Sequence, residues 1–349
     1  MRAVVVDAVE ARPEVRAVAE PATPEDGVLV QVMATGLCRS DWHAWAGHDD
    51  DVVFPHVPGH ELAGIVVDTG PDVRRWRPGD RVTVPFVCGC GRCEFCRAGQ
   101  AQVCPHQTQP GFTHWGSFAE YVALHAADVN LVAVPEEVEF ATAASLGCRF
   151  ATAYRALAHR ARVREGEWTT VIGAGGVGLS AVMIGRALGA RVVAVDRHPE
   201  ALALARELGA EQVVLSDGID VPAAVADLTD GGSHVAVDAV GSEQTCADAI
   251  LSLRRRGRHV QVGLLPPVDG QHPRVPMARA IGWELDLLGS HGMAASDYPE
   301  LLALVERGIV QPERLIERTI DLDEAAALLP GFDQAPVAGI TVIDPRLVR

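Results

Sequence analysis

The sequence predicts an α/β protein of two domains, the first rich in β-strands and the second built on a doubly wound parallel sheet. Three observations predict this fold. The chain has 349 residues, which suits two domains of ordinary size. Short apolar runs separated by Gly, Pro and Asp fill residues 3–135, and strand-like and helix-like segments alternate from residue 141 to 289. Hydrophobic residues make up 48% and charged residues 22%, so we expect the whole chain to fold.

The charge excludes several classes of partner and chemistry. The chain carries 46 acidic and 30 basic residues, and a net charge of −16 repels nucleic acids and anionic membranes. All 30 basic residues are arginine, so a Schiff-base lysine, a pyridoxal-phosphate anchor and a Walker-type lysine are excluded. Asp7 ends the first apolar run too early for a secretory signal, and no run approaches the roughly 20 residues of a membrane span. We therefore expect a cytoplasmic protein without a membrane partner.

The elements of the first domain are short strands. Apolar runs at 28–33, 63–67, 81–84 and 118–124 predict them, and helical periodicity is scarce before residue 135.

The elements of the second domain alternate regularly. A helix is expected over 141–161, followed by strand 168–172, helix 175–188, strand 191–195 and helix 199–208. The alternation continues with strand 212–215, helix 221–228, strand 234–238, helix 246–253 and strands 258–262 and 285–288. Six strands with intervening helices are typical of a full dinucleotide-binding fold. The tail predicts a helix over 298–307 and a strand over 339–343, so we assign 1–149 and 290–349 to the first domain and 150–289 to the second.

Five of the eight cysteines lie between Cys88 and Cys104, and such clustering in an intracellular chain indicates metal binding rather than disulfides. Cys90, Cys93, Cys96 and Cys104 have the spacing of a closed, tetrahedral zinc site, which supports folding and performs no chemistry. Cys88 lies outside this spacing. An iron–sulfur or redox role for the loop is the alternative.

A second metal site is indicated by Cys38, His60 and Cys148. Two thiolates and one imidazole form an open zinc site whose fourth position is free for water or substrate. Cys38 and the tripeptide Gly59-His60-Glu61 lie at ends of predicted strands, and Cys148 lies in the helix that leads into the second domain. Taken singly, such residues are more often packed in a core.

Two further segments make the pattern specific: 59–64 (Gly-His-Glu-Leu-Ala-Gly), followed by Gly70 and Val73, and 38–43 (Cys-Arg-Ser-Asp-Trp-His). With the four-cysteine loop, the chain resembles a zinc-containing alcohol dehydrogenase of the medium-chain dehydrogenase/reductase (MDR) family over essentially its whole length. The resemblance implies a GroES-like catalytic domain, a Rossmann cofactor domain and two zinc ions per chain, one catalytic and one structural.

The resemblance also implies roles for individual residues. Cys38, His60 and Cys148 would hold the catalytic zinc, with Glu61 close enough to replace its water. Ser40 would touch the substrate hydroxyl, His43 would end the proton relay, and Asp41 would orient the histidine ligand. A solvated loop histidine is the alternative for His43.

A dinucleotide-binding motif follows the strand at 168–172. Its residues are Gly173, Gly175, Gly176, Val177 and Gly178, which suit a tight turn, close approach to a pyrophosphate and packing of helix on strand. Asp196 lies 23 residues after Gly173, at the end of the next strand, where its carboxylate can accept both ribose hydroxyls and repel a 2′-phosphate. This favours NAD over NADP. Arg197 beside it can accommodate that phosphate or stack on adenine.

The rest of the cofactor site is implied by the resemblance. Arg39 would reach the pyrophosphate and Thr152 the nicotinamide, and the ribose and carboxamide would be lined by Ala239, Val240, Val262, Gly263 and Leu264. The family commonly has an arginine after the glycine that corresponds to Gly339, and this chain has Ile340. One pyrophosphate contact is therefore expected to be missing.

The substrate is predicted less sharply. Trp42, Trp45, Phe86 and Trp115 lie near the ligand segments and can form an apolar pocket, although Trp45 can equally belong to the core. The resemblance places Phe86 against the substrate, and Cys148 in place of a carboxylate favours simple alcohols over polyols. The alternatives are a polyol-oxidising or glutathione-linked relative and a non-catalytic zinc and dinucleotide binding protein. We expect an alcohol or aldehyde as partner and a homotetramer, or else a dimer, paired through the edge strand near 285–288.

Overall fold

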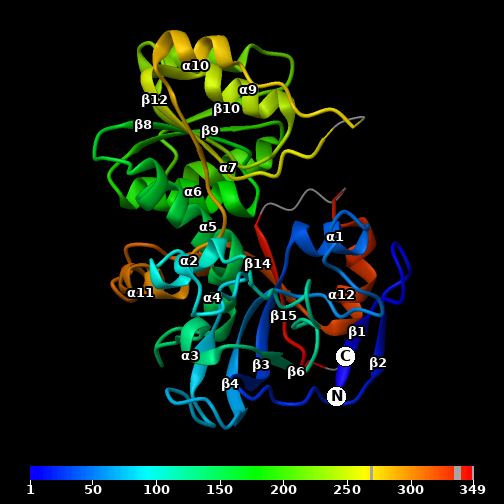
Figure 1. Cartoon of the computed structure of the whole chain (residues 1–349). Coiled ribbons are helices and arrows are strands. Elements are labelled where there is room, and N and C mark those ends of the chain that lie inside the picture. The colour runs from blue at the N-terminus through cyan, green and yellow to red at the C-terminus, as the bar shows by residue number, and fades with distance from the viewer. Residues whose placement is uncertain (268–269, 334–338, 348–349) are drawn as a thin grey trace.

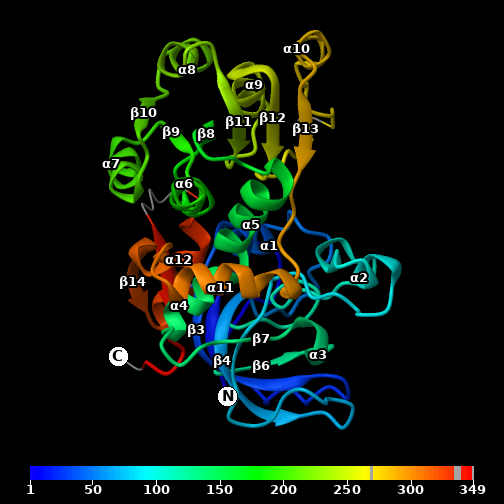
Figure 2. The same cartoon turned by 90° about the vertical axis from the view of Figure 1, so that its left-hand side faces the viewer.

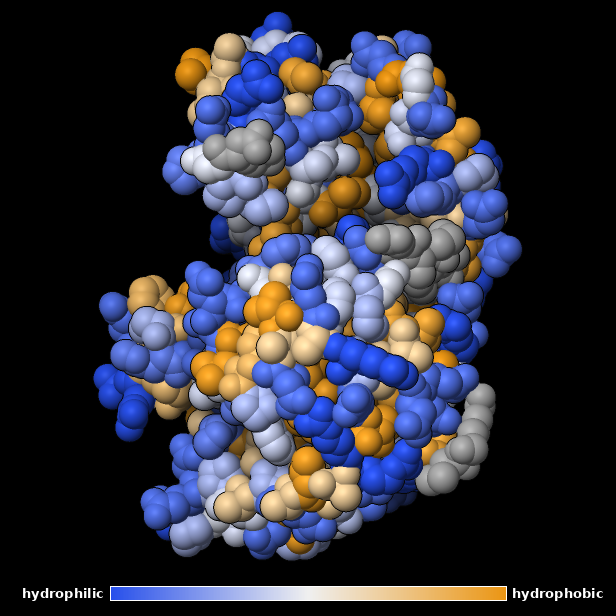
Figure 3. Space-filling model, turned by 90° about the vertical axis from the view of Figure 1, so that its right-hand side faces the viewer, coloured by the Kyte–Doolittle hydropathy of each residue, from blue (hydrophilic) through white to orange (hydrophobic). Residues whose placement is uncertain are grey.

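The computed structural model describes residues 1–267, 270–333 and 339–347. The chain forms two lobes, one above the other in Figure 1. In the described part of the chain, no helix is both long enough and apolar enough to cross a membrane. On the face drawn in Figure 3, hydrophilic and hydrophobic residues are interspersed over both lobes.

The lower lobe is built on a seven-stranded sheet of order β14-β15-β3-β4-β5-β7, with β6 paired to β3. The predicted apolar runs form β3 (Val28–Leu37), β4 (Glu61–Thr69), β5 (Arg81–Thr83) and β6 (Tyr121–Leu124). The remaining strands are β7 (Val132–Ala133), β14 (Ile316–Ile320), β15 (Ile340–Ile343) and the separate pair β1 (Arg2–Val5) and β2 (Glu14–Ala17). Strand β15 pairs with β3, opposite Leu37, so the tail returns to this sheet.

The upper lobe is a six-stranded parallel sheet of order β10-β9-β8-β11-β12-β13. Its strands are β8 (Trp168–Ile172), β9 (Arg191–Asp196), β10 (Gln212–Leu215), β11 (Ser233–Asp238), β12 (Leu253–Gln261) and β13 (Asp286–Gly289). The order reverses between β8 and β11, and in doubly wound sheets ligands bind at this switch point. The predicted doubly wound fold is confirmed, and β13 lies at the edge of the sheet in Figure 2.

Helices cover both lobes (Figures 1 and 2). The lower lobe carries α1 (Arg39–Trp45), α2 (Glu94–Arg97), α3 (Ala127–Asn130), α4 (Phe140–Ser145), α11 (Tyr298–Glu306) and α12 (Leu322–Leu328). The upper lobe carries α6 (Gly176–Ala187), α7 (Pro199–Leu208), α8 (Val221–Thr229), α9 (Glu243–Leu251) and α10 (Met277–Trp283). Short 3₁₀ turns are η1 (Ala101–Val103), η4 (Ala295–Asp297), η5 (Pro312–Leu315) and η6 (Leu329–Gly331).

The helix expected over 246–253 begins earlier and ends earlier than the sequence predicted. Ser242 caps α9, because its side chain accepts a hydrogen bond from the backbone of Thr245. Leu253 already belongs to β12, where it pairs with Ser233.

The helical run over 140–161 connects the lobes, but it is not one regular α-helix. It comprises α4, the π-helical segment η2 (Leu146–Phe150), α5 (Ala151–Tyr154) and a second π-helical segment η3 (Arg155–Ala161). Leu146, Phe150 and Leu157 are completely buried in a core cluster that extends into both lobes. Cys148 lies in η2, and π-helical turns are frequent at functional sites.

Candidate active site

Four potential ligands meet where β3, β4 and η2 come together. Cys38, His60, Glu61 and Cys148 each offer one ligand atom, and these atoms all lie within 4.8 Å of one another. Gly36 near the end of β3 pairs with Glu61 at the start of β4. This antiparallel register brings Cys38, which follows β3, beside His60, which precedes β4. The arrangement can hold one metal ion.

Asp41 ties the loops of this cluster together. Its carboxylate accepts hydrogen bonds from the backbone N–H of Cys38 at 2.8 Å, the backbone N–H of Gly59 at 3.1 Å and Nδ1 of His60 at 2.9 Å. Asp41 is the third residue of α1, so the start of this helix aims the carboxylate back at the ligand segments. Both Asp41 and His60 are completely buried.

The donor set fits a zinc ion. With Nδ1 bound to Asp41, Nε2 of His60 is buried and has no hydrogen-bond partner within the described ranges. A buried polar atom without a partner is costly unless a ligand satisfies it. The hydrogen bond with Cys148 lowers the pKa of the Cys38 thiol, although burial opposes the shift. Thiolate and imidazole are the donors that zinc prefers.

Arg149 accompanies Glu61 in the cluster. Its backbone N–H and its Nε both donate to Oε1 of Glu61, at 3.1 and 3.0 Å, and its Nη2 donates to Oε2. Burial raises the pKa of Glu61, and the charge of Arg149 opposes that shift. The sequence reasoning missed Arg149, although its position directly after Cys148 was an available signal.

A second metal site is formed by the four-cysteine loop. The sulfur atoms of Cys90, Cys93, Cys96 and Cys104 lie within 4.8 Å of one another. Backbone N–H groups point at these sulfurs, as from His106 to Cys104 at 3.3 Å. Hydrogen bonds from the backbone, that of Arg92 foremost, lower the pKa of Cys90 to about 6. Four cysteine sulfurs gathered in this way suit a closed zinc site.

The glycine-rich motif lies between the end of β8 and the start of α6. Gly173 has a φ of +94°, which favours glycine, and a side chain at Gly178 would overlap the carbonyl of Gly173. Asp196 at the end of β9 accepts hydrogen bonds from the backbone N–H groups of Ala174 at 2.6 Å and His198 at 2.9 Å. The turn, the open helix N-terminus and the carboxylate together suit a dinucleotide.

Comparison with known proteins decides the family. The model of the alcohol dehydrogenase GroES-like domain matches residues 24–136, and the model of the zinc-binding dehydrogenase matches 176–307. An alcohol dehydrogenase of Geobacillus stearothermophilus is 33% identical over 348 residues, which is 98% of each chain. The chain belongs to the zinc-dependent alcohol dehydrogenase family.

Other similar proteins share this family name. Alcohol dehydrogenase 2 of Caenorhabditis elegans is 33% identical over 95% of this chain and 93% of its own. Among solved structures, the alcohol dehydrogenase TADH from Thermus sp. ATN1 has a TM-score of 0.89 at 31% identity, with 99% of both chains covered. These likenesses support the GroES-like and Rossmann assignments of the two lobes, and the recognised MDR family is confirmed.

The predicted relay residues of this zinc-dependent alcohol dehydrogenase lie on α1. Oγ of Ser40 is 3.9 Å from the sulfur of Cys38. His43 is half-buried, and its Nδ1 lies 3.0 Å from Nδ1 of His48. Burial, and then the proximity of His48, lower the pKa of His43. The sequence reasoning missed His48, which is exposed.

Aromatic rings surround the histidine ligand. The ring of His60 lies 6.1 Å from that of Phe86 and 5.3 Å from that of Phe112, and Phe86 in turn lies 5.2 Å from His291. Phe112 and His291 had no motif to indicate them.

The three tryptophans lie differently. Trp42 packs edge-on against His43 and also against a core cluster. Trp45 packs against the same cluster and donates to the carbonyl of Ala11, which favours the core alternative. Trp115 is 36% exposed, and its indole donates to the carbonyl of Pro55 at 3.0 Å.

The residues expected to line the dinucleotide follow the ends of the parallel strands. Ala239 and Val240 follow β11, whereas Val262, Gly263 and Leu264 follow β12; Val240 and Leu264 are exposed, at 45% and 69%. Thr152 is buried in α5, Arg39 is exposed at the start of α1, and Arg197 is exposed beside Asp196.

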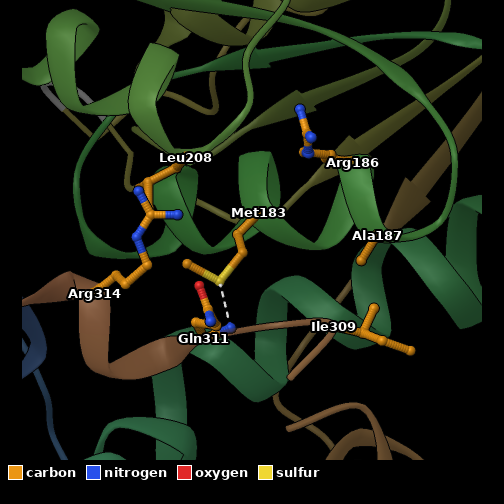
Figure 4. Close-up of a pocket in the computed structure, with 7 residues that line it drawn as sticks. All are labelled: Met183, Arg186, Ala187, Leu208, Ile309, Gln311 and Arg314. Atoms are coloured by element: carbon orange, nitrogen blue, oxygen red, sulfur yellow. Dashed lines mark hydrogen bonds between the residues drawn. The ribbon is translucent and has the colours of Figure 1, made fainter. Parts of the chain in front are cut away.

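Cavities also lie away from the metal clusters in the described part of the chain. One of about 490 Å³ is bordered by Ile172, Val195, Asp220 and Thr245 at the carboxyl ends of β8 and β9, where a doubly wound sheet binds its ligand. Another, of about 380 Å³, lies between α6, α7 and the segment 309–314 (Figure 4). There the backbone N–H of Gln311 donates to the sulfur of Met183 at 3.2 Å.

Proposed function

We propose that this protein is an NAD-dependent alcohol dehydrogenase that transfers a hydride reversibly between an alcohol and NAD and yields an aldehyde or a ketone. The proposal is carried by one observation: the metal cluster and the dinucleotide motif adjoin. Arg149, the neighbour of Cys148, contacts Glu61 on one side, and its side chain lies against Gly176 on the other. A substrate at the cluster is thus close to a cofactor at the motif, as hydride transfer requires.

Each group has a defined part in this reaction. Cys38, His60 and Cys148 would hold a zinc ion, which would supply the Lewis acidity that eases loss of the substrate's hydroxyl proton. The glycine-rich motif would hold the dinucleotide, which would supply the hydride acceptor. Asp41 keeps the proton of His60 on Nδ1, so that Nε2 faces the cluster. Ser40 would accept the proton of the substrate hydroxyl and release its own proton to His43, which would pass a proton on toward the exposed His48.

The cofactor preference rests on Asp196. Its carboxylate is fixed by Ala174 and His198 at the end of β9, where it accepts ribose hydroxyls and repels a 2′-phosphate. A zinc-binding dehydrogenase from Sinorhizobium meliloti that is 29% identical was solved bound to NADP. Assays with both dinucleotides therefore belong to the first experiment.

The substrate class rests on the rings around His60. Phe86 and Phe112 give the cluster an apolar wall, which favours apolar or aromatic primary and secondary alcohols. The alternatives within the family are a polyol-oxidising and a glutathione-linked enzyme. Their substrates need polar partners that these rings do not provide. A non-catalytic zinc and dinucleotide binding protein is the remaining alternative.

The test is a spectrophotometric assay of NADH formation with aliphatic, aromatic, secondary and polyol substrates, run in parallel with NADP and with a zinc chelator. We expect chelator-sensitive turnover with NAD and the highest kcat/KM for aromatic alcohols. Turnover of polyols alone would favour the polyol-oxidising alternative. Dinucleotide binding without turnover of any substrate would favour the non-catalytic one.

We also propose that the enzyme is a cytoplasmic homotetramer. A reducing compartment preserves the eight thiols, all of which are free in the structure. Pairing is expected through β13, the edge strand of the upper sheet, near which Ile281 of α10 is 75% exposed. Light scattering tests this state, and a monomeric mass would contradict it.

A further inference from the structure

Arg149 lies at the boundary between the metal cluster and the dinucleotide motif. It follows Cys148 in η2, and only 5% of its surface is exposed. A Cβ atom at Gly176, the first residue of α6, would lie 2.5 Å from Cδ and 3.4 Å from Nη1 of Arg149. The glycine thus makes room for the arginine at the start of the helix.

The hydrogen bonds of Arg149 use only one edge of its guanidinium. Nε and Nη2 both donate to the carboxylate of Glu61. Within residues 1–267, 270–333 and 339–347, Nη1 has no hydrogen-bond partner. A guanidinium has five N–H donors, so a buried arginine retains donors for a ligand on its Nη1 edge.

The position of Nη1 suits a pyrophosphate. Gly176 begins the 12-residue helix α6, and the N–H groups at a helix N-terminus attract phosphate oxygens. An arginine side chain stays protonated in proteins, so it brings a positive charge to this position.

Ile340 stands at the position where the resemblance implies an arginine. It is completely buried within β15 and pairs with Ile316. Its side chain provides no donor. Arg149 reaches the dinucleotide motif from a different element, η2, near the middle of the chain.

We propose that Arg149 binds the pyrophosphate of the dinucleotide through Nη1 while Nε and Nη2 hold Glu61. This inference rests on the proposed function, because it assumes that a dinucleotide occupies the motif. Arg149 is then a cofactor-binding residue and, toward Glu61, a positioning residue. It replaces the contact that Ile340 cannot make, and it links the position of Glu61 to occupation of the cofactor site.

The test is isothermal titration of the zinc-loaded enzyme with ADP-ribose and with adenosine. ADP-ribose contains the pyrophosphate and adenosine does not. For Arg149→Met we expect ADP-ribose to bind roughly 10- to 100-fold more weakly, as for loss of a charge-assisted hydrogen bond, and adenosine to bind as in the wild type. Arg149→Lys keeps the positive charge but not the planar, forked guanidinium, so its affinity for ADP-ribose should lie between those of the wild type and Arg149→Met.

Arg155→Met is the matched control. Arg155 is also buried and lies in the same helical run, but it pairs with Asp297 at 3.3 Å and Gln100 at 2.6 Å. We expect it to bind ADP-ribose as the wild type does. Thermal melting and zinc content establish that each variant is folded and loaded. If Arg149→Met does not fold, because Glu61 is left buried and unpaired, the double variant Arg149→Met/Glu61→Gln takes its place under the same criteria.

Two results would overturn the inference while leaving the proposed function intact. They are unchanged binding of ADP-ribose by the Arg149→Met variant, and equal loss of ADP-ribose and adenosine. Failure of the wild type itself to bind ADP-ribose would instead overturn the proposed function. The two failures are therefore distinguishable.

Discussion

The carboxylate of Asp41 accepts a hydrogen bond from Nδ1 of His60 at 2.9 Å, and neither side chain is accessible to solvent. The same carboxylate holds the backbone of Cys38 and of Gly59. One acidic residue on α1 thus sets the tautomer of the histidine ligand and the spacing of the two segments that carry the first ligands. This relationship makes Asp41 a determinant of metal affinity.

We predict that Asp41→Asn lowers the affinity of the catalytic site for zinc by roughly 10- to 100-fold. The asparagine side chain keeps one acceptor oxygen. Its NH₂ group, however, takes the place of the second carboxylate oxygen of Asp41 and faces N–H donors that this oxygen accepts in the wild type. Zinc content after dialysis against a graded series of chelator measures the change. Asp321→Asn is the control, because Asp321 is buried at the start of α12 and accepts a hydrogen bond from the backbone of Glu324. Equal zinc retention by both variants would contradict the assignment.

For the four-cysteine loop, we predict that Cys96→Ser removes one of the two zinc ions and lowers the melting temperature. Three sulfurs do not complete a tetrahedral site, and the loop depends on that site for its fold. Cys88→Ser should keep both ions, because Cys88 is buried with its sulfur 3.5 Å from the carbonyl of Pro85, outside the ligand group. Metal analysis and differential scanning calorimetry measure both effects, and retention of two ions by Cys96→Ser would refute the structural site.

The sequence predicted the features that depend on spacing along the chain. The alternation of apolar runs and helices yields the parallel sheet, because its central strands β8, β9 and β11 are largely buried on both faces. Cys38 and His60 could be paired from motifs alone, and antiparallel pairing of β3 with β4 brings them together.

What the sequence could not predict depends on contacts between distant segments. The side chain of Arg149 lies against Gly176 because a π-helical turn sets the direction of that side chain. No periodic pattern in the sequence predicts such a turn. His48 and Phe112 carry no motif, so only the folded chain places their rings beside His43 and His60. The same holds for the tryptophans, because the hydrophobicity of a ring does not tell whether it lies in a core or lines a pocket.

A pH-dependent prediction concerns His43 and His48. Burial lowers the pKa of His43 first, and the neighbouring His48 lowers it further. Removal of that neighbour in His48→Gln should raise the pKa of His43. If neutral His43 is the proton acceptor, the acid limb of the kcat/KM profile moves to higher pH. The exposed His106→Gln serves as control, and an unchanged or lowered acid limb in His48→Gln would exclude His43 from the relay.

For cofactor choice, we predict that Asp196→Ser raises the KM for NAD by roughly 10- to 100-fold, the effect of losing a hydrogen bond to a charged group. The same change should improve the ratio of kcat/KM for NADP over NAD, since the repulsion of a 2′-phosphate disappears. Asp230→Asn is the control, because it removes one charge at an exposed left-handed position in the same lobe. An unaltered NADP ratio in Asp196→Ser would contradict the assignment of the carboxylate to the ribose.

The final prediction concerns stability in acid and His114. Burial, with a smaller effect of His125, lowers the pKa of His114 to about 4, and its Nε2 has no hydrogen-bond partner in the described part of the chain. The unfolded chain titrates near 6.5, so between about pH 6.5 and pH 4 the unfolded state binds more protons than the folded state. Stability is therefore complete above pH 6.5 and falls as the pH drops through this window.

Replacing His114 should remove that dependence. Linkage predicts that this one group lowers the free energy of unfolding of the wild type by about 2 kcal/mol between pH 7 and pH 5. In His114→Gln this contribution is absent, so the free energy of unfolding should fall by that much less over the same interval. Buried His56 and His259, whose pKa values burial also lowers, preserve the rest of the acid sensitivity. Urea unfolding at both pH values measures the difference, with the exposed His272→Gln as control. The variant and the wild type carry the same zinc ligands, so any loss of metal in acid affects both proteins equally. An equal fall in the free energy of unfolding of both proteins would contradict the prediction and show that His114 titrates as an exposed histidine.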